Sequence, residues 1–235
     1  MLPSCKMLSM DTASKPVLPH QLQSLTNHSV LYSREEILST TSLPPSVPGV
    51  YAWFFRDTPG NVPVDDCITK GFFTLLYVGI SPDKIGKPNS RQNLRRRITT
   101  HFQGNAEGST LRRSLGVLLT ETSGYPLRRV GSGKRMTLTH SGEQWLDEWM
   151  AQNAFVCWLQ HETPWELEGE LLGSLSLPLN IKGNRYHLFA KALTEARVQA
   201  IRDARERPIA VENNQRRISK VATPSPLLTT TDTFF

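Results

Sequence analysis

Hydrophobic residues gather in three runs that are separated by longer polar stretches. The runs cover residues 49–55 (GVYAWFF), 72–80 (FFTLLYVGI) and 154–160 (AFVCWLQ). β-branched and aromatic residues are frequent in them, and a Thr-Pro-Gly-Asn turn signal at 58–61 follows the first run, which is the pattern of β-strands. The first two runs are almost continuously apolar, so we expect strands that are covered on both faces.

Helix signals occupy much of the remaining chain. Capping boxes, in which a Ser precedes Glu or Gln by three residues, begin at Ser33 and Ser141. The strongest helix start is 163–166 (TPWE), with a cap, a Pro at the first helical position and a Glu at the third. The predicted helices cover about 34–38, 91–101 with Ser90 as the cap, 109–119, 142–150, 164–175 and 186–207, and a basic hairpin is expected at 125–139.

Composition narrows the class of protein. The net charge is +6, which favours a polyanionic partner such as DNA, RNA or an anionic membrane surface. Cys5, Cys67 and Cys157 are isolated in the sequence, which argues against a disulfide framework or a structural zinc site and fits a reducing compartment. No signal-peptide pattern is present, and the longest apolar run is too short to span a bilayer. We therefore expect a cytoplasmic protein without a membrane segment.

Two short patterns on the first two strands suggest a family. Gly49-Val50-Tyr51 and Tyr77-Val78-Gly79 resemble the two half-motifs that give the GIY-YIG superfamily its name. The helix that follows carries Leu94, then Arg97 and His101, which is similar to the family's helix with its catalytic Arg. Positions i and i+4 project from one helix face, so Arg97 and His101 are expected side by side.

A third pattern completes the resemblance. Glu168 is followed by an apolar pair and then by Pro178 and Asn180, at the spacing of the family's metal-binding Glu, Pro and Asn. The order and element types of these pieces carry the resemblance, since each half-motif alone occurs by chance. The resemblance implies an endonuclease that depends on Mg²⁺, with Mn²⁺ as the alternative ion. It assigns the catalytic set Tyr51, Tyr77, Arg97, His101, Glu168 and Asn180, with Glu168 as the metal ligand.

The chemistry of phosphodiester hydrolysis agrees with this set. The reaction needs an activated water, neutralised phosphoryl oxygens and help for the leaving oxygen. One carboxylate, here Glu168, can hold Mg²⁺ if waters and a phosphate oxygen complete the octahedron. The planar guanidinium of Arg97 matches a phosphate in a bidentate manner. The resemblance gives Tyr51 the attacking water, Tyr77 a second hydroxyl, His101 an auxiliary proton-transfer role and Asn180 an orienting one.

The chain departs from compact family members in two places. Residues 59–70 form an added loop between the half-motifs, and about fifty residues separate the Arg97 helix from the third strand, a long connection that implies an insertion at about 103–153. Many basic residues lie there or on the Arg97 helix, and we expect a nucleic-acid-binding surface, for DNA rather than RNA. Its predicted members are Arg95, Arg96, Arg112, Arg113, Arg128, Arg129, Lys134 and Arg135.

The expected fold is α/β, a small three-stranded antiparallel sheet flanked by helices with a basic helical insertion. We expect the chain to divide into four segments: a loosely ordered region with a short helix at 1–44, a nuclease domain at 45–181, a packed C-terminal helix at 182–210 and a disordered tail at 211–235.

Several alternatives stay open. Glu170 lies on the same helix as Glu168 and competes with it as the metal ligand, and Glu166 fits better as a capping residue. The segment 131–134 (GSGK) is not a phosphate loop, because arginines occupy two positions of that motif. A catalytically inactive nucleic-acid-binding module is the main alternative function, and a regulatory protein that binds other proteins through its basic face is a third.

Overall fold

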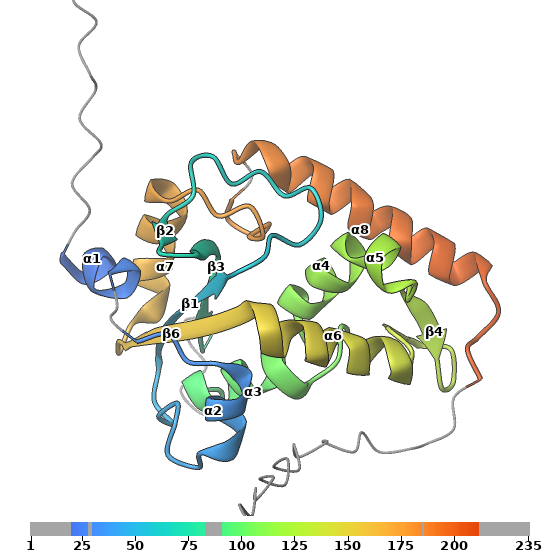
Figure 1. The fold of residues 1–235 in the computed structure, drawn as a ribbon, viewed down its shortest axis with the longest axis horizontal. Coiled ribbons are helices and arrows are strands. Elements are labelled where there is room, and N and C mark those ends of the chain that lie inside the picture. The colour runs from blue at the N-terminus through green and yellow to red at the C-terminus, as the bar shows by residue number, and fades with distance from the viewer. Residues whose placement is uncertain (1–19, 28–29, 83–90, 185, 212–235) are drawn as a thin grey trace, which may run out of the picture.

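The computed structural model describes residues 20–27, 30–82, 91–184 and 186–211. Figure 1 shows helices packed around a curled sheet. In chain order, the elements are α1 (His20–Thr26), α2 (Arg34–Ser39), β1 (Gly49–Phe55), β2 (Thr69–Lys70), β3 (Phe73–Ser81), α3 (Leu94–Gln103), α4 (Thr110–Leu118), α5 (Thr120–Ser123), β4 (Arg128–Val130), β5 (Arg135–Thr137), α6 (His140–Asn153), β6 (Ala154–Gln160), α7 (Pro164–Ser174) and α8 (Leu188–Glu206).

The main sheet is antiparallel and has the strand order β2-β3-β1-β6. β1 lies between β3 and β6 and is buried at every position, as its continuous apolar sequence predicts. The expected α/β class is confirmed, but the expectation of three strands is wrong. The fourth strand, β2, is only two residues long. A segment of two residues is too short to show an alternation of apolar and polar positions, so the sequence did not predict it.

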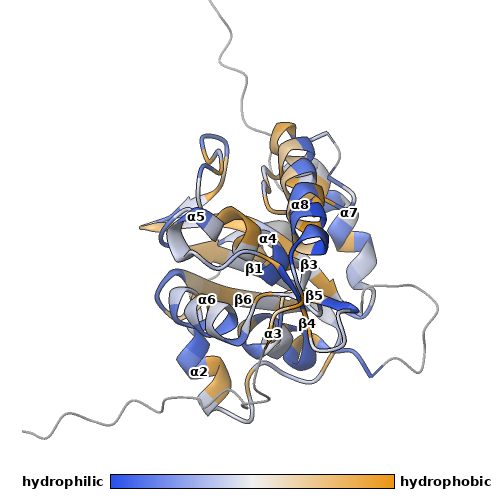
Figure 2. Cartoon of the chain, turned by 90° about the vertical axis from the view of Figure 1, so that its right-hand side faces the viewer, coloured by the Kyte–Doolittle hydropathy of each residue, from blue (hydrophilic) through white to orange (hydrophobic). Residues whose placement is uncertain are grey.

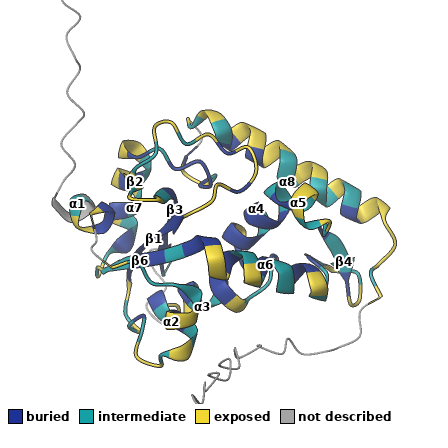
Figure 3. Cartoon of the chain, viewed as in Figure 1, coloured by how far each residue is buried: buried dark blue, intermediate teal, exposed yellow. Residues whose placement is uncertain are grey.

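Alternating residues of β1 pack into two separate hydrophobic cores. Tyr51, Trp53 and Phe55 belong to one hydrophobic cluster, which also contains residues of α3, α4 and α6. Val50 and Phe54 belong to the other, which contains residues of α1 and α7. Successive strand residues point to opposite faces, so the sheet is covered on both sides. In Figure 3 the central strands accordingly have mostly the colour of buried residues.

Helix α8 lies along α4 and the β4–β5 hairpin. Seen nearly end-on in Figure 2, it carries both hydrophilic and hydrophobic residues. Its buried residues Ala190, Leu193 and Ala204 face the protein. None of the helices within the described ranges is both long and apolar enough to cross a membrane.

Most predicted helices are present, but some of the capping residues differ. The Ser33–Glu36 capping box is confirmed, with both of its hydrogen bonds formed. Ser90 lies outside the described residues, and α3 is capped by Asn93, whose side chain accepts a hydrogen bond from the Arg96 amide. Ser141 is not a cap, because α6 begins earlier and Thr139 caps it.

The predicted start of α7 is confirmed, with Thr163 as the N-cap, Pro164 at the first position and Glu166 in the first turn. The Thr163 side chain makes no capping bond to a backbone amide, and its hydroxyl donates to the Glu166 carboxylate (2.7 Å). The N-terminal region contains α1, a helix that the sequence did not predict, and its Leu25 is buried in the core beneath the sheet. The expected disordered tail lies almost entirely outside the described residues.

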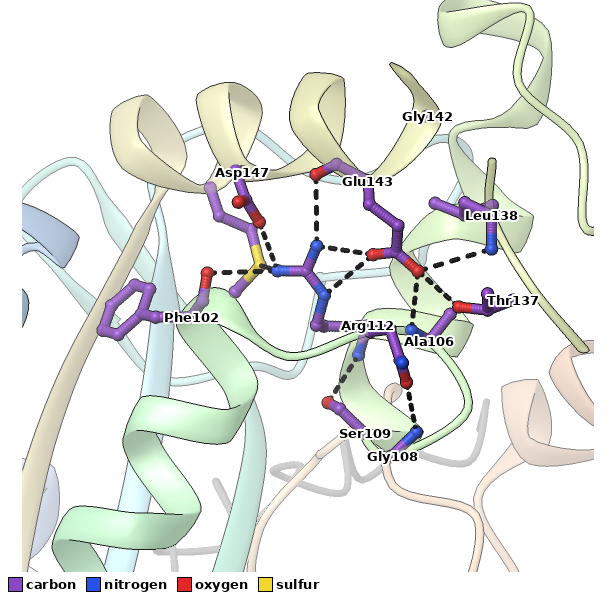
Figure 4. Close-up of polar contacts among 12 residues, drawn as sticks. Phe102, Ala106, Gly108, Ser109, Arg112, Thr137, Leu138, Gly142, Glu143 and Asp147 are labelled. Carbon is purple, nitrogen blue, oxygen red and sulfur yellow. Dashed lines mark hydrogen bonds and ion pairs between the residues drawn. The ribbon is translucent and has the colours of Figure 1, made fainter. Parts of the chain in front are cut away.

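A buried ion-pair network joins α4 to α6 (Figure 4). The fully buried guanidinium of Arg112 donates to Glu143 Oε2 (2.7 Å from Nη2). It also donates to the carbonyls of His101 (3.3 Å) and Phe102 (3.1 Å). Asp147 Oδ1 lies 2.7 Å from its Nη1. The prediction that Arg112 binds nucleic acid is therefore wrong, because no part of this side chain is accessible to a substrate.

Glu143 is the centre of the same network. Its carboxylate accepts from the amide of Ala106 (2.8 Å) and from the hydroxyl of Thr137. Burial raises the pKa of Glu143, but the Arg112 guanidinium and these hydrogen bonds outweigh burial and hold it below its usual value. The carboxylate therefore stays charged and ties the segment after α3, the hairpin and α6 together.

We expect Glu143→Gln to lower the free energy of unfolding by about 3 kcal/mol, because it removes one partner of a buried ion pair and leaves the Arg112 charge undercompensated. The measurement is urea denaturation followed by circular dichroism. Glu148→Gln, at an exposed position of the same helix, is the control and should change stability by less than about 0.5 kcal/mol. Equal stabilities of the two variants would contradict a structural role for this network.

Candidate active site

A cavity of about 320 Å³ opens between β1, β3, α3, α7 and α8. Water occupies roughly 30 Å³ per molecule in the liquid, so the cavity has room for a phosphate and several waters. It brings together five of the six residues predicted to be catalytic, and the sixth, His101, lies behind Tyr51. The lining residues are Tyr51, Tyr77, Gly79, Ile80, Arg97, Thr110, Glu168, Leu179, Asn180, Ile181, Lys182 and Arg197.

Tyr51 reaches this cavity because of its register in the sheet. It pairs with Gly79 of β3, and its phenol lies directly over that glycine. A Cβ atom at Gly79 would overlap the Tyr51 hydroxyl. Packing therefore explains the glycine of the second half-motif, since any side chain at position 79 would displace Tyr51 of the first half-motif.

The Tyr51 hydroxyl lies in a buried hydrogen-bond chain. Its oxygen is 2.9 Å from His101 Nε2, and it accepts a bond from Arg97 Nε (3.4 Å). His101 Nδ1 is 2.7 Å from the hydroxyl oxygen of Ser109, which also caps α4 by accepting from the Arg112 amide (3.1 Å). The hydroxyl proton of Tyr51 is best accepted by His101 Nε2, because Arg97 offers only donors.

Burial and the neighbouring cations set the protonation of this chain. Burial, together with the arginines at 97 and 112, holds the pKa of His101 well below its usual value, so the imidazole is neutral near pH 7. Burial first, and then Tyr77, raises the pKa of Tyr51 well above its usual value, against the opposing effect of Arg97. The resting pair is therefore a neutral phenol beside a neutral imidazole.

Glu168, and not its rival Glu170, lies at this cavity. Glu168 lines the wall and acts electrostatically on Tyr51, whereas Glu170 is exposed and is not among the lining residues. The two side chains diverge because they are two positions apart on a helix. Tyr77 and Arg97 complete the polar wall, and the ring centroids of the two tyrosines are 6.5 Å apart.

The donor set fits a Mg²⁺ ion bound mainly through water. Within the described part of the chain, no three or more His, Cys, Asp and Glu side chains cluster as metal ligands do. A site with Glu168 as its carboxylate is nevertheless suited to Mg²⁺, which retains several waters and takes one or two carboxylates together with substrate phosphate oxygens. Glu168 is therefore the residue that would hold the ion.

Asn180 has a structural reason to be present. Its side-chain amide accepts from the Val78 amide (2.9 Å) and donates to the Val78 carbonyl (2.7 Å). β2 pairs only with residues 73 and 74 of β3, so beyond it the backbone edge of β3 needs another partner. Asn180 supplies that partner and fixes the strand between Tyr77 and Gly79.

Three polar lining residues were missed by the sequence analysis: Thr110 of α4, Lys182, and Arg197 of α8. Lys182 lies two positions after Asn180, so its proximity to the motif was a usable signal. Arg197 had no such signal, because α8 carries many charges and only the tertiary packing selects one of them.

None of the predicted nucleic-acid-binding residues lines the cavity. Arg97, which directly follows two of them on α3, does line it. Arg96, Lys134 and Arg135 are exposed, and Arg95 and Arg113 are partly buried. The Nη2 groups of Arg128 and Arg129 donate to the carbonyls of residues 208 (3.0 Å) and 207 (2.9 Å). These two arginines therefore also hold the hairpin against the end of α8.

Comparison with known proteins agrees with this geometry. Searches of curated proteins and of solved structures returned no match. A family model described as the GIY-YIG catalytic domain matches residues 49–199, which include β1, β3, α3, α7 and the greater part of α8. The matched range thus contains every residue that lines the cavity, and the chain belongs to the GIY-YIG family.

Proposed function

We propose that this protein is a metal-dependent endonuclease that hydrolyses phosphodiester bonds, with DNA as its preferred substrate. Family membership supports a nuclease-type function acting on nucleic acid. The observation that carries the proposal is the convergence of Tyr51, Tyr77, Arg97, Glu168 and Asn180 on one cavity. These residues come from separate parts of the chain, and a module that only binds nucleic acid has no need of a carboxylate beside two tyrosines and an arginine.

In the proposed reaction, Arg97 binds the scissile phosphate. Its guanidinium lies on the cavity wall and also donates to Tyr51, so it can bring the phosphate next to the tyrosine. A fixed cation of this kind stabilises the charge that develops on the phosphoryl oxygens. Glu168 would hold a divalent ion, which when bound would supply further charge neutralisation and lower the pKa of the attacking water.

Proton transfer is assigned to the chain of Tyr51, His101 and Ser109. Tyr51 takes a proton from the attacking water while its own proton passes to His101 Nε2. The imidazole is held for this step by Ser109, which accepts from Nδ1–H in this tautomer. The depressed pKa of His101 keeps the imidazole neutral before the reaction, and in this tautomer Nε2 can accept the proton.

The first test is cleavage of supercoiled plasmid by the purified protein, with Mg²⁺ or with EDTA. We expect metal-dependent nicking or linearisation, and a loss of at least about 10²-fold in rate in Glu168→Gln and in Arg97→Ala. Glu170→Gln is the matched control, because it removes an exposed carboxylate from the same helix. DNA binding without cleavage of plasmid, branched or single-stranded DNA, unchanged in Glu168→Gln, would favour the binding-module alternative.

The register of Tyr51 over Gly79 gives a second prediction. Gly79→Ala should displace the phenol from His101 and Arg97 and slow cleavage by about 10²-fold, as small misplacements of catalytic groups do. Gly173→Ala in α7 is the control, since a Cβ atom there meets no other atom within 4 Å. A Gly79→Ala enzyme of normal rate would show that Tyr51 needs no fixed position.

The state of His101 gives a prediction about pH. Because its folded pKa is below the unfolded value of about 6.5, the unfolded chain binds more protons as the pH falls. This histidine alone should therefore lower stability by up to about 1.4 kcal/mol per pH unit below pH ~6.5. Urea denaturation at pH 7 and pH 5 measures the effect, which should be smaller in His101→Gln. An identical pH dependence in the two proteins would show that the pKa of His101 in the folded protein is not lowered from its unfolded value.

A further inference from the structure

Arg197 forms part of the cavity wall although it is distant in sequence from every motif. It projects from α8, is partly buried, and lines the cavity with Tyr77 and Arg97. α8 packs against α4, so Arg197 comes close to Arg113 of that helix, and the two charges act on each other. The helix α8 thus places a cation at the site that the other elements form.

The charge of Arg197 is not compensated by an acid. Among the residues that the structure describes, no carboxylate pairs with its guanidinium and no hydrogen bond is formed to it. Burial, and then the nearby Arg113, lower the pKa of Arg197. Arg113 itself donates from Nε to the Ala106 carbonyl (3.0 Å), which adds no negative charge. A partly buried guanidinium near another cation is unfavourable unless an anion binds to it.

Arg97 and Arg197 reach the cavity from different elements. Arg97 of α3 donates to the Tyr51 hydroxyl (3.4 Å), whereas Arg197 lines the cavity from α8 and, among the described residues, makes no hydrogen bond to Tyr51. A guanidinium fork fits a phosphate well, and a nucleic-acid strand presents another phosphate next to the one that is cut.

We propose that Arg197 forms a second phosphate-binding subsite of the cavity, which holds a phosphate flanking the scissile one on the same DNA strand, and that Arg113 of α4 adds positive charge from outside the cavity wall. This inference rests on the proposed nuclease function and adds α8 to the substrate-binding surface. Lys182, exposed at the edge of the same cavity, extends the positive charge toward the incoming strand. The subsite acts in binding and positioning, so it should affect KM more than kcat.

The test compares Arg197→Gln with Arg202→Gln, which removes the same charge from an exposed position of α8 away from the cavity. Binding of a short fluorescein-labelled DNA duplex is measured by anisotropy in EDTA, which prevents cleavage, over a series of salt concentrations. We expect Arg197→Gln to weaken binding by about 10-fold and to reduce the slope of log K against log salt by about 1. Arg202→Gln should change affinity by less than about 2-fold.

Two further measurements separate binding from folding. Arg197→Lys should restore the salt slope but only part of the affinity, because an ammonium group lacks the planar fork. The thermal midpoint of Arg197→Gln should equal or exceed that of the unmodified protein, since the substitution removes an uncompensated charge. A clear fall in that midpoint would make Arg197 a structural residue and overturn the subsite.

The outcomes also distinguish this inference from the proposed function. If the protein cleaves DNA and the two Gln variants bind alike, the subsite is wrong and the nuclease assignment stands. If only Arg197→Gln weakens binding and no substrate is cut, the subsite stands without hydrolysis. An unmodified protein that neither binds nor cleaves DNA refutes both.

Discussion

The buried guanidinium of Arg112 is the constraint on which the active site depends. It binds Glu143 of α6 and the carbonyls of His101 and Phe102 at the end of α3. The amide of Arg112 also donates to Ser109, which in turn contacts His101. One residue therefore holds the backbone of the histidine and the hydroxyl that orients its ring. Removing one charged partner from such a network destabilises the protein by more than the intact ion pair stabilises it, because the other charge stays buried without compensation.

Electrostatics links this support to the chemistry. Arg97 and Arg112 both disfavour a charged His101, and Arg197 adds a further cation to the cavity wall. Apart from Glu168, the residues lining the cavity contribute no carboxylate. The cavity lining therefore carries more cationic than acidic side chains, a composition that favours the binding of an anion. Arrangements of this kind sacrifice stability of the free protein for binding of an anion.

Some features could be predicted from the sequence because they are local. The ranges of β1 and β6 agree with the predicted runs residue for residue, as continuous apolarity requires. The order of the motif residues was sufficient to select Tyr51, Arg97 and Glu168 from many candidates. Burial of charge was not predictable in the same way. Nothing in the sequence around Arg112 distinguishes it from the exposed Arg96, because the acid that neutralises it lies thirty-one residues away. Arg197 was missed because only the tertiary packing of α8 brings it to the cavity.

The segment between α3 and β6 contributes directly to the candidate site. It provides Ser109 to the hydrogen-bond chain of Tyr51, Arg112 to the support of α3, and Thr110 to the cavity wall. It also provides Arg113, whose charge acts on Arg197. Because these residues belong to one helix and its cap, a shift of α4 would alter the proton-transfer chain and the phosphate subsite together. The proposed chemistry and substrate positioning thus share a single structural element.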